Sequence, residues 1–116
     1  MRLTITDNLI ARTANDGQSV VFAVKCWDDS AEPWTLTAPT TLRYRLDDYD
    51  TGQQIIGWTA GSASSSQTIT VSGANNTPAG CESRYRRLLT VQINLGLSTV
   101  AVATRDFWVK NIGGVT

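Results

Sequence analysis

The chain has 116 residues, of which 41% are hydrophobic and 17% are charged, and its ten basic and ten acidic residues cancel. This length is typical of one domain, so we expect a single domain over residues 1–116. A neutral chain has no general electrostatic reason to bind nucleic acid or an anionic membrane. Its apolar runs also fall short of the roughly 18 residues that a membrane span needs. We therefore expect neither nucleic acid nor a membrane among its partners.

The first third of the chain predicts two strands. Leu3 and Ile5 alternate with polar residues, which is typical of a short strand with one wet face. This segment lacks the apolar core of a signal peptide, so we expect synthesis in a cytoplasm without general secretion. A turn signal at 15–17 (Asn-Asp-Gly) precedes an apolar, β-branched run over 19–27, which predicts a central strand. The side chains that share its inward face are Val20, Phe22, Val24 and Cys26.

The middle third predicts a short edge strand and a hairpin. Residues 34–37 form the edge strand, which Pro39 ends. Residues 41–47 alternate most cleanly of all, and a hairpin signal at 50–52 (Asp-Thr-Gly) returns the chain along a strand over 53–59. The side chains that the alternation places inward are Leu42, Tyr44 and Leu46.

The last third predicts three more strands, over 67–72, 87–95 and 98–110. The inward side chains of the first two are Ile69, Val71, Leu89, Val91, Ile93 and Leu95. In the last strand the inward phase changes near Thr104 and Arg105, which predicts a β-bulge or bend at that point.

Short strands with turn signals every 8–12 residues or so predict the fold class. We expect an all-β fold, an immunoglobulin-like antiparallel β-sandwich of about seven strands. A small Greek-key barrel of the OB type is the alternative.

The two cysteines test the strand order. Cys26 and Cys81 have a spacing that resembles the immunoglobulin disulfide. However, Cys26 lies at the end of its strand and Cys81 lies in the loop before the sixth strand, so the two should fall at opposite ends of the sandwich. A disulfide needs Cα atoms within about 7 Å of each other. We therefore predict two free thiols, with Cys26 as a small buried hydrophobic residue.

The sequence holds little that could perform catalysis. Histidine is absent, which removes the usual general base and most zinc sites. The chain also lacks the Gly-x-Ser-x-Gly turn and a Gly-rich phosphate loop. The cluster Asp47-Asp48-Tyr49-Asp50 could bind calcium, but its spacing differs from the EF-hand loop, and a solvated hairpin turn explains it better. We expect no enzymatic activity, no cofactor and no metal.

Arginines gather at two places, Arg84-Tyr85-Arg86-Arg87 and the outer side of the strand that carries Arg43 and Arg45. A phosphate-contacting patch is one interpretation. The neutral charge of the chain instead favours outward arginines that pair with nearby acids or contact a partner protein.

Four tryptophans are many for this length, and they are Trp27, Trp34, Trp58 and Trp108. Trp58 and Trp108 lie in predicted strands, where we expect them to fill the core or its rim. Trp27 and Trp34 flank one loop and are the better candidates for exposure. Exposed tryptophans suit a sugar-binding platform, but anchors of a protein interface are the preferred interpretation.

Three segments resemble a family of small tailed-bacteriophage proteins. They are 41–48 with Gly52 and Trp58-Thr59, then 87–99, and the ending 107–112, and they lie in the last two-thirds of the chain. The resemblance implies a virion-associated β-sandwich, either a capsid decoration (cement) protein or a head–tail or tail accessory. It implies no catalytic residue, and the first third of the chain has no counterpart.

We therefore expect a virion protein, made in the host cytoplasm, that docks on the major capsid protein as a decoration protein. The expected contacts are the N-terminal strand and the residues Trp27, Trp34, Arg84, Arg86 and Arg87. Alternatives are a head–tail (neck) or tail adaptor and a host-surface or glycan-binding module that uses Trp27 and Trp34. The sequence leaves the oligomeric state open, a homo-oligomer included.

Overall fold

The computed structural model describes residues 2–76, 83–94 and 100–111, and these residues form an all-β fold. The strands are β1 (Arg2–Asp7), β2 (Thr13–Asn15), β3 (Val20–Asp28), β4 (Thr35–Leu36), β5 (Thr41–Asp48), β6 (Gln54–Ala60), β7 (Ser66–Val71), β8 (Arg84–Asn94) and β9 (Val100–Lys110). A single 3-10 turn among the described residues, η1 (Gly73–Asn76), follows β7.

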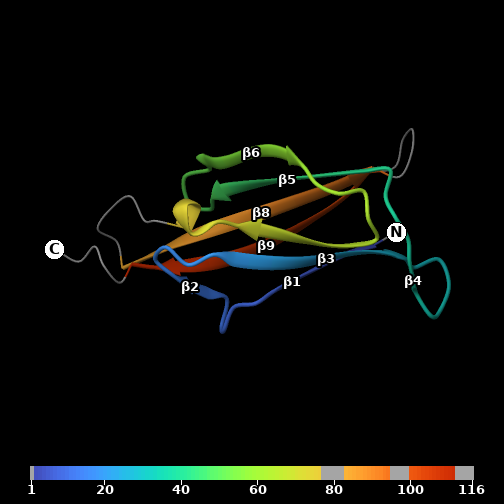
Figure 1. Ribbon diagram of the computed structural model, residues 1–116, viewed down its shortest axis with the longest axis horizontal. Coiled ribbons are helices and arrows are strands. Elements are labelled where there is room, and N and C mark those ends of the chain that lie inside the picture. Colours follow the sequence, from blue (N-terminus) through green and yellow to red (C-terminus); the bar gives the residue numbers. More distant parts are fainter. Residues whose placement is uncertain (1, 77–82, 95–99, 112–116) are drawn as a thin grey trace.

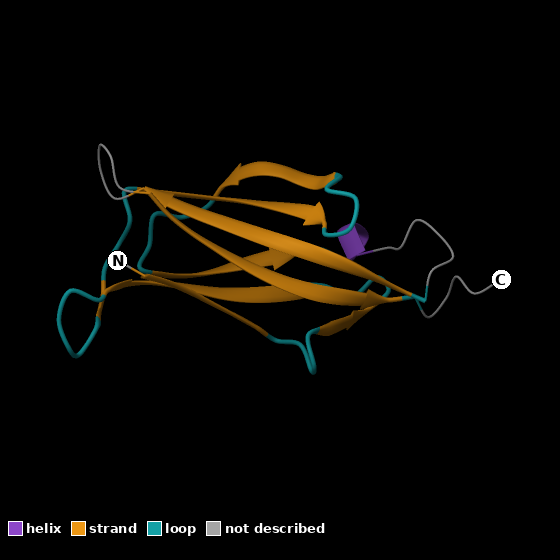
Figure 2. Ribbon diagram, turned by 180° about the vertical axis from the view of Figure 1, so that it is seen from behind, coloured by secondary structure: helices purple, strands orange, loops and turns teal. Residues whose placement is uncertain are grey.

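The strands form two sheets that pack face to face as a β-sandwich (Figures 1 and 2). One sheet has five strands in the order β2-β9-β8-β5-β6. In the other sheet β3 pairs with β1, with β4 and with β7. All pairs are antiparallel except β2 with β9, which is parallel. The arrangement is compatible with the β-sandwich expected from the sequence.

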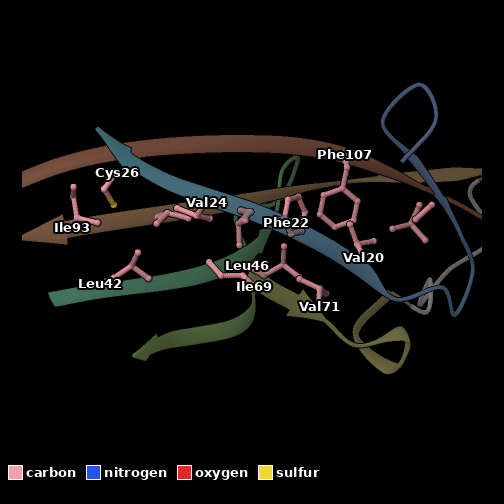
Figure 3. Packing of buried hydrophobic residues seen from close by; sticks show 14 residues of the cluster. Val20, Phe22, Val24, Cys26, Leu42, Leu46, Ile69, Val71, Ile93 and Phe107 are labelled. Carbon is pink, nitrogen blue, oxygen red and sulfur yellow. The ribbon is translucent and has the colours of Figure 1, made fainter. Parts of the chain in front are cut away.

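The core lies between the two sheets and is built from the alternating inward residues of each strand. Val20, Phe22, Val24 and Cys26 of β3 are fully buried, as the alternation predicts. They face inward residues of the other sheet, and the rings of Phe22 and Phe107 lie 5.5 Å apart at 55° (Figure 3). Burial of a Phe or Val side chain contributes about 1.5–3 kcal/mol, so this layer is the main source of stability.

The two predicted turns need the left-handed backbone that glycine adopts most readily. Gly17 has a φ of +76° and Gly52 a φ of +73°. Asp48 fixes the second turn, because its Oδ1 accepts hydrogen bonds from the backbone N–H groups of Asp50 and Thr51, each at 3.0 Å.

The predicted bulge in the last strand is wrong. β9 pairs with β8 without a register shift from Arg84↔Lys110 to Asn94↔Val100. The inward phase is constant, but small alanines and Arg105 occupy inward positions while Val102 faces outward at 57% exposure. With a large apolar residue outside and small or charged residues inside, the sequence pattern looks like a change of phase although the strand has none. The register shifts of the sandwich lie in the β5–β6 pair instead, on both sides of Leu46.

β2 is a strand that the sequence did not indicate, because three residues are too few for a detectable alternation.

Cys26 is a free, fully buried thiol, and burial raises its pKa above the ordinary value. Cys81 lies outside the described residues.

Candidate functional site: the outer face of the five-stranded sheet

The outer face of the five-stranded sheet carries most of the exposed aromatic and arginine side chains. We call this surface the arginine–aromatic face. Its residues are Arg43, Arg45, Asp47 and Tyr49 on and after β5, Trp58 on β6, Arg84 and Arg86 on β8, and Val102, Asp106 and Trp108 on β9. They lie together because the outward positions of neighbouring antiparallel strands face one another, as Arg86 and Trp108 do.

Trp58 marks one part of this face. Its side chain is 42% exposed, and the guanidinium carbons of Arg43 and Arg45 lie 4.1 Å and 5.5 Å from its ring centroid. Arg45 is fixed by two hydrogen bonds to Asp47, at 2.7 Å and 2.9 Å, and these raise its pKa above the ordinary value. Arg43 donates from Nε to Gln92 Oε1. The arginines thus hold the indole in place, which reduces the ordering required when a partner binds.

Arg86 organises the other part. Its guanidinium carbon lies 3.7 Å from the Tyr49 ring centroid and 5.5 Å from that of Trp108. It donates two hydrogen bonds to Asp106 Oδ2, at 2.7 Å and 3.0 Å. These bonds lower the pKa of Asp106 and raise that of Arg86. Arg84 stacks on Trp108, with its guanidinium carbon 4.2 Å from the Trp108 ring centroid.

The face has more cations than acids, although the whole chain is neutral. Asp47 and Asp106 are its carboxylates, and both already pair with arginines. Within residues 2–76, 83–94 and 100–111, no ion pair engages Arg43, Arg84 or the neighbouring Lys110. The face therefore retains positive charge that an acidic partner surface could neutralise.

A shallow hollow of about 340 Å³ adjoins Arg43 at one end of this face. Its lining residues are Thr41, Arg43, Gln92, Ile93 and Asn94, and most of the surface that they expose to the hollow is apolar. An exposed indole beside a hollow with some polar side chains is an arrangement that can stack a flat ligand and hydrogen-bond its rim.

The five contact residues predicted from the sequence do not form one surface. Arg84 and Arg86 belong to the arginine–aromatic face. Trp27 and Trp34 lie at the opposite sheet, where Trp27 pairs with Arg2 of β1, and the Arg2 guanidinium stacks 4.5 Å from the Trp34 ring. Both indoles are only partly exposed, and their Nε1 atoms donate to Thr4 Oγ1 and Glu32 Oε1. A single flat partner could not contact both groups.

Arg87 is buried, so the expectation that its side chain points outward with those of Arg84 and Arg86 is wrong. It is only 6% exposed, and its Nη1 donates to Asp48 Oδ2 at 3.1 Å. The reason is the two-residue period of β8, because Arg87 shares the inward phase of the buried Leu89.

The exposure of Trp58 corrects the expectation that it fills the core or rim; Trp108 is half-buried. The pairing of β6 with β5 gives the reason, and the sequence alone does not show this pairing. Trp58 has the same phase along β6 as Ala60, which pairs with the outward Arg43. Tyr49, at 45% exposure, was missed because it lies beyond the predicted end of its strand.

The acidic cluster of the hairpin is occupied by structural contacts. Asp47 pairs with Arg45, Asp48 pairs with Arg87, and Asp48 also caps the turn. In the described ranges, no group of three or more Cys, Asp or Glu residues is arranged to hold a metal ion.

Comparisons with known proteins leave the face to be interpreted from its own geometry. No family model matches the chain, and a search of the curated proteins finds no match. Among the described residues, no helix has the length and hydropathy to cross a membrane.

Proposed function

We propose that this protein is a non-catalytic binding domain that docks on a partner protein through the arginine–aromatic face. One observation carries the proposal. Of the five large hydrophobic side chains that are exposed in the described residues, three lie on this one sheet surface: Tyr49 at 45%, Trp58 at 42% and Val102 at 57%. Exposed apolar side chains that cluster on one face, among arginines, are typical of an interface.

The composition of the face supports a protein partner. Trp, Tyr and Arg are the residue types most enriched among interface hot spots. Arg86 is already held by Asp106, Tyr49 and Trp108, so little side-chain entropy is lost when it is covered. Preorganised aromatic and guanidinium groups of this kind give affinity from few contacts.

The resemblance to tailed-bacteriophage proteins supports the virion as the setting. In that setting the domain is a decoration protein on the major capsid protein. Each copy makes a modest contact, and the many contacts repeated by the capsid symmetry give strong overall binding through avidity. A head–tail or tail adaptor on the same sandwich is the neighbouring proposal, and copy number separates the two.

The setting is tested by quantitative mass spectrometry of particles purified from cells that make the chain. Hundreds of copies per particle support a decoration protein, whereas about a dozen support an adaptor. Particles that lack the protein altogether would overturn the virion proposal.

The docking face is tested by adding the purified protein back to particles that lack it. Trp58→Ala should weaken binding by about 30-fold, which corresponds to the roughly 2 kcal/mol of a hot spot. Leu36→Ala is the matched control, because Leu36 is 46% exposed but belongs to the other sheet. Equal binding by the wild type and Trp58→Ala would refute the docking face.

A glycan-binding module is the second candidate, and the hollow beside Arg43, on the face that carries Trp58, favours it. A glycan array decides between the two. Binding that disappears in Trp58→Ala and survives in Trp34→Ala would favour a glycan. An array without any positive sugar would remove this candidate.

A further inference from the structure

The exposed strand edges of the sandwich are not equally protected against pairing with another chain. Natural sheets protect an edge by shortness, by charge, by proline or by a bulge. β2 and β4 are very short, with three and two residues. β1 begins with Arg2 and ends with Asp7, and β6 has two register shifts against β5.

β7 has none of these protections. It pairs with β3 in an unbroken register from Val20↔Val71 to Lys25↔Ser66, and its six residues include no charge and no proline. Its surroundings are also uncharged, because the sequence holds no Asp, Glu, Lys or Arg from Thr51 to Asn76. An edge strand that is regular, uncharged and six residues long is a ready template for another strand.

The backbone groups that β7 presents can be assigned from its pairing. The N–H of Cys26 donates to the carbonyl of Ser65, so every second residue from Ser65 onward is bonded to β3. The residues between them, Ser66, Thr68 and Thr70, direct their N–H and C=O groups away from β3. Both groups of Ser66 are satisfied by the Ser64 hydroxyl. Thr68 and Thr70 have no further backbone bond among the described residues.

We propose that a second copy of this chain adds to β7, antiparallel and about a two-fold axis at Ile69. In this register Thr68 of each copy faces Thr70 of the other. The two pairs exchange four backbone hydrogen bonds, which satisfy all eight groups that the two edges present. Cross-strand threonine pairs are themselves favourable.

The absence of charge points to a second copy rather than to a different protein. In a two-fold interface each residue meets a symmetry-related copy of its own surface, so a charge close to the axis meets its like. Residues 51–76 avoid this repulsion completely. The cation Lys25 of β3 pairs with Ser66, at the end of the strand and away from the axis at Ile69. This interface does not involve the arginine–aromatic face, and the inference does not depend on the proposed function.

The oligomeric state is measured first, by sedimentation velocity of the purified full chain over a concentration series. The monomer mass is 12.6 kDa, and dimerisation doubles it. A monomer at all concentrations up to about 1 mM would overturn the proposal.

The edge is identified by hydrogen exchange of single amides, because only two amides of β7 should respond to dimerisation. The N–H groups of Thr68 and Thr70 should exchange at least ten times more slowly at dimer concentrations than at monomer concentrations. The N–H of Ile69 is bonded to β3 and should be protected in both states. Protection elsewhere, with no change at Thr68 and Thr70, would assign the dimer to another surface and refute this one.

Two variants test the same edge without removing a bond to β3. Thr68→Pro removes an edge N–H, which an edge strand tolerates, and Thr68→Lys places like charges close to the axis. Both should raise the dimer dissociation constant at least tenfold while circular dichroism and Tm show a folded domain. Ala60→Lys on β6 is the matched control and should dimerise like the wild type. Dimers that survive both Thr68 changes, or that are lost in Ala60→Lys, would contradict the proposal.

Discussion

The ion pair between Arg105 and Asp7 tests the revised phase of β9. It joins the two sheets, since Arg105 is on β9 and Asp7 ends β1. Arg105 Nε donates to Asp7 Oδ2 at 2.9 Å, and the Leu9 N–H donates to Asp7 Oδ1 at 3.0 Å. The Asp7 side chain is 3% exposed and that of Arg105 is 25% exposed, so the carboxylate is the more deeply buried charge.

This difference in burial predicts unequal effects of the two truncations. Arg105→Ala leaves a buried carboxylate with the Leu9 N–H as its remaining donor, and it should destabilise the fold by about 3–4 kcal/mol. Asp7→Ala leaves a guanidinium that can reach water, so the loss is that of the charged hydrogen bonds, about 2 kcal/mol.

Urea denaturation of the two single variants and the double variant measures these effects and their coupling. The double variant should lose less than the sum of the singles, with a coupling energy of about 1–3 kcal/mol. Thr104→Ala is a matched control on the neighbouring outward position and should change stability by less than about 0.5 kcal/mol. If Arg105→Ala also costs less than about 0.5 kcal/mol, then Arg105 faces water and the assigned phase of β9 is wrong.

Three further predictions concern the core, the thiol and the outer face. Phe22→Ala should cost about 3–5 kcal/mol in thermal or urea unfolding, because the ring is fully buried against the other sheet. In a Cys81→Ala background, the raised pKa and burial of Cys26 should prevent labelling by thiol reagents until the domain unfolds, and fast labelling of the native state would contradict this. The Arg86 hydrogen bonds lower the pKa of Asp106, so the stability from this pair is present above pH about 4 and is lost as pH falls through the lowered pKa. Asp106→Asn should therefore weaken the acid dependence of stability below pH about 4, and an unchanged profile would refute the linkage.

Much of the sandwich follows from the two-residue period alone. The alternation of β3, β5, β7 and β8 identifies their buried sides, because each has one face on the core and one face in water. The same rule was sufficient to place Arg87 inside, next to Leu89. The error came from treating three arginines in one short segment as a surface cluster, although Arg86 and Arg87 must point in opposite directions in a strand.

The arginine–aromatic face was less accessible to sequence reasoning. Its residues come from β5, β6, β8 and β9, and the order of these strands in the sheet decides which side chains meet. Trp58 lies beside Arg45 because β5 and β6 adopt the register in which Arg43 pairs with Ala60 and Tyr44 pairs with Thr59. Strand order and register depend on packing between distant segments, and one sequence does not specify them. The sequence also did not predict the parallel pairing of β2 with β9, because this pairing joins distant segments.

The two proposed surfaces lie on different sheets, and together they make a specific arrangement. Pairing of β7 with its symmetry mate joins the two four-stranded sheets into one continuous sheet, and the two-fold axis runs perpendicular to it. Both five-stranded sheets therefore lie on the same side of this continuous sheet. Their arginine–aromatic faces then point in one direction, which suits two contacts with one extended surface. The two perturbations should therefore act differently on binding to particles. Trp58→Ala weakens every contact, whereas Thr68→Pro leaves each contact intact and removes the avidity of the pair.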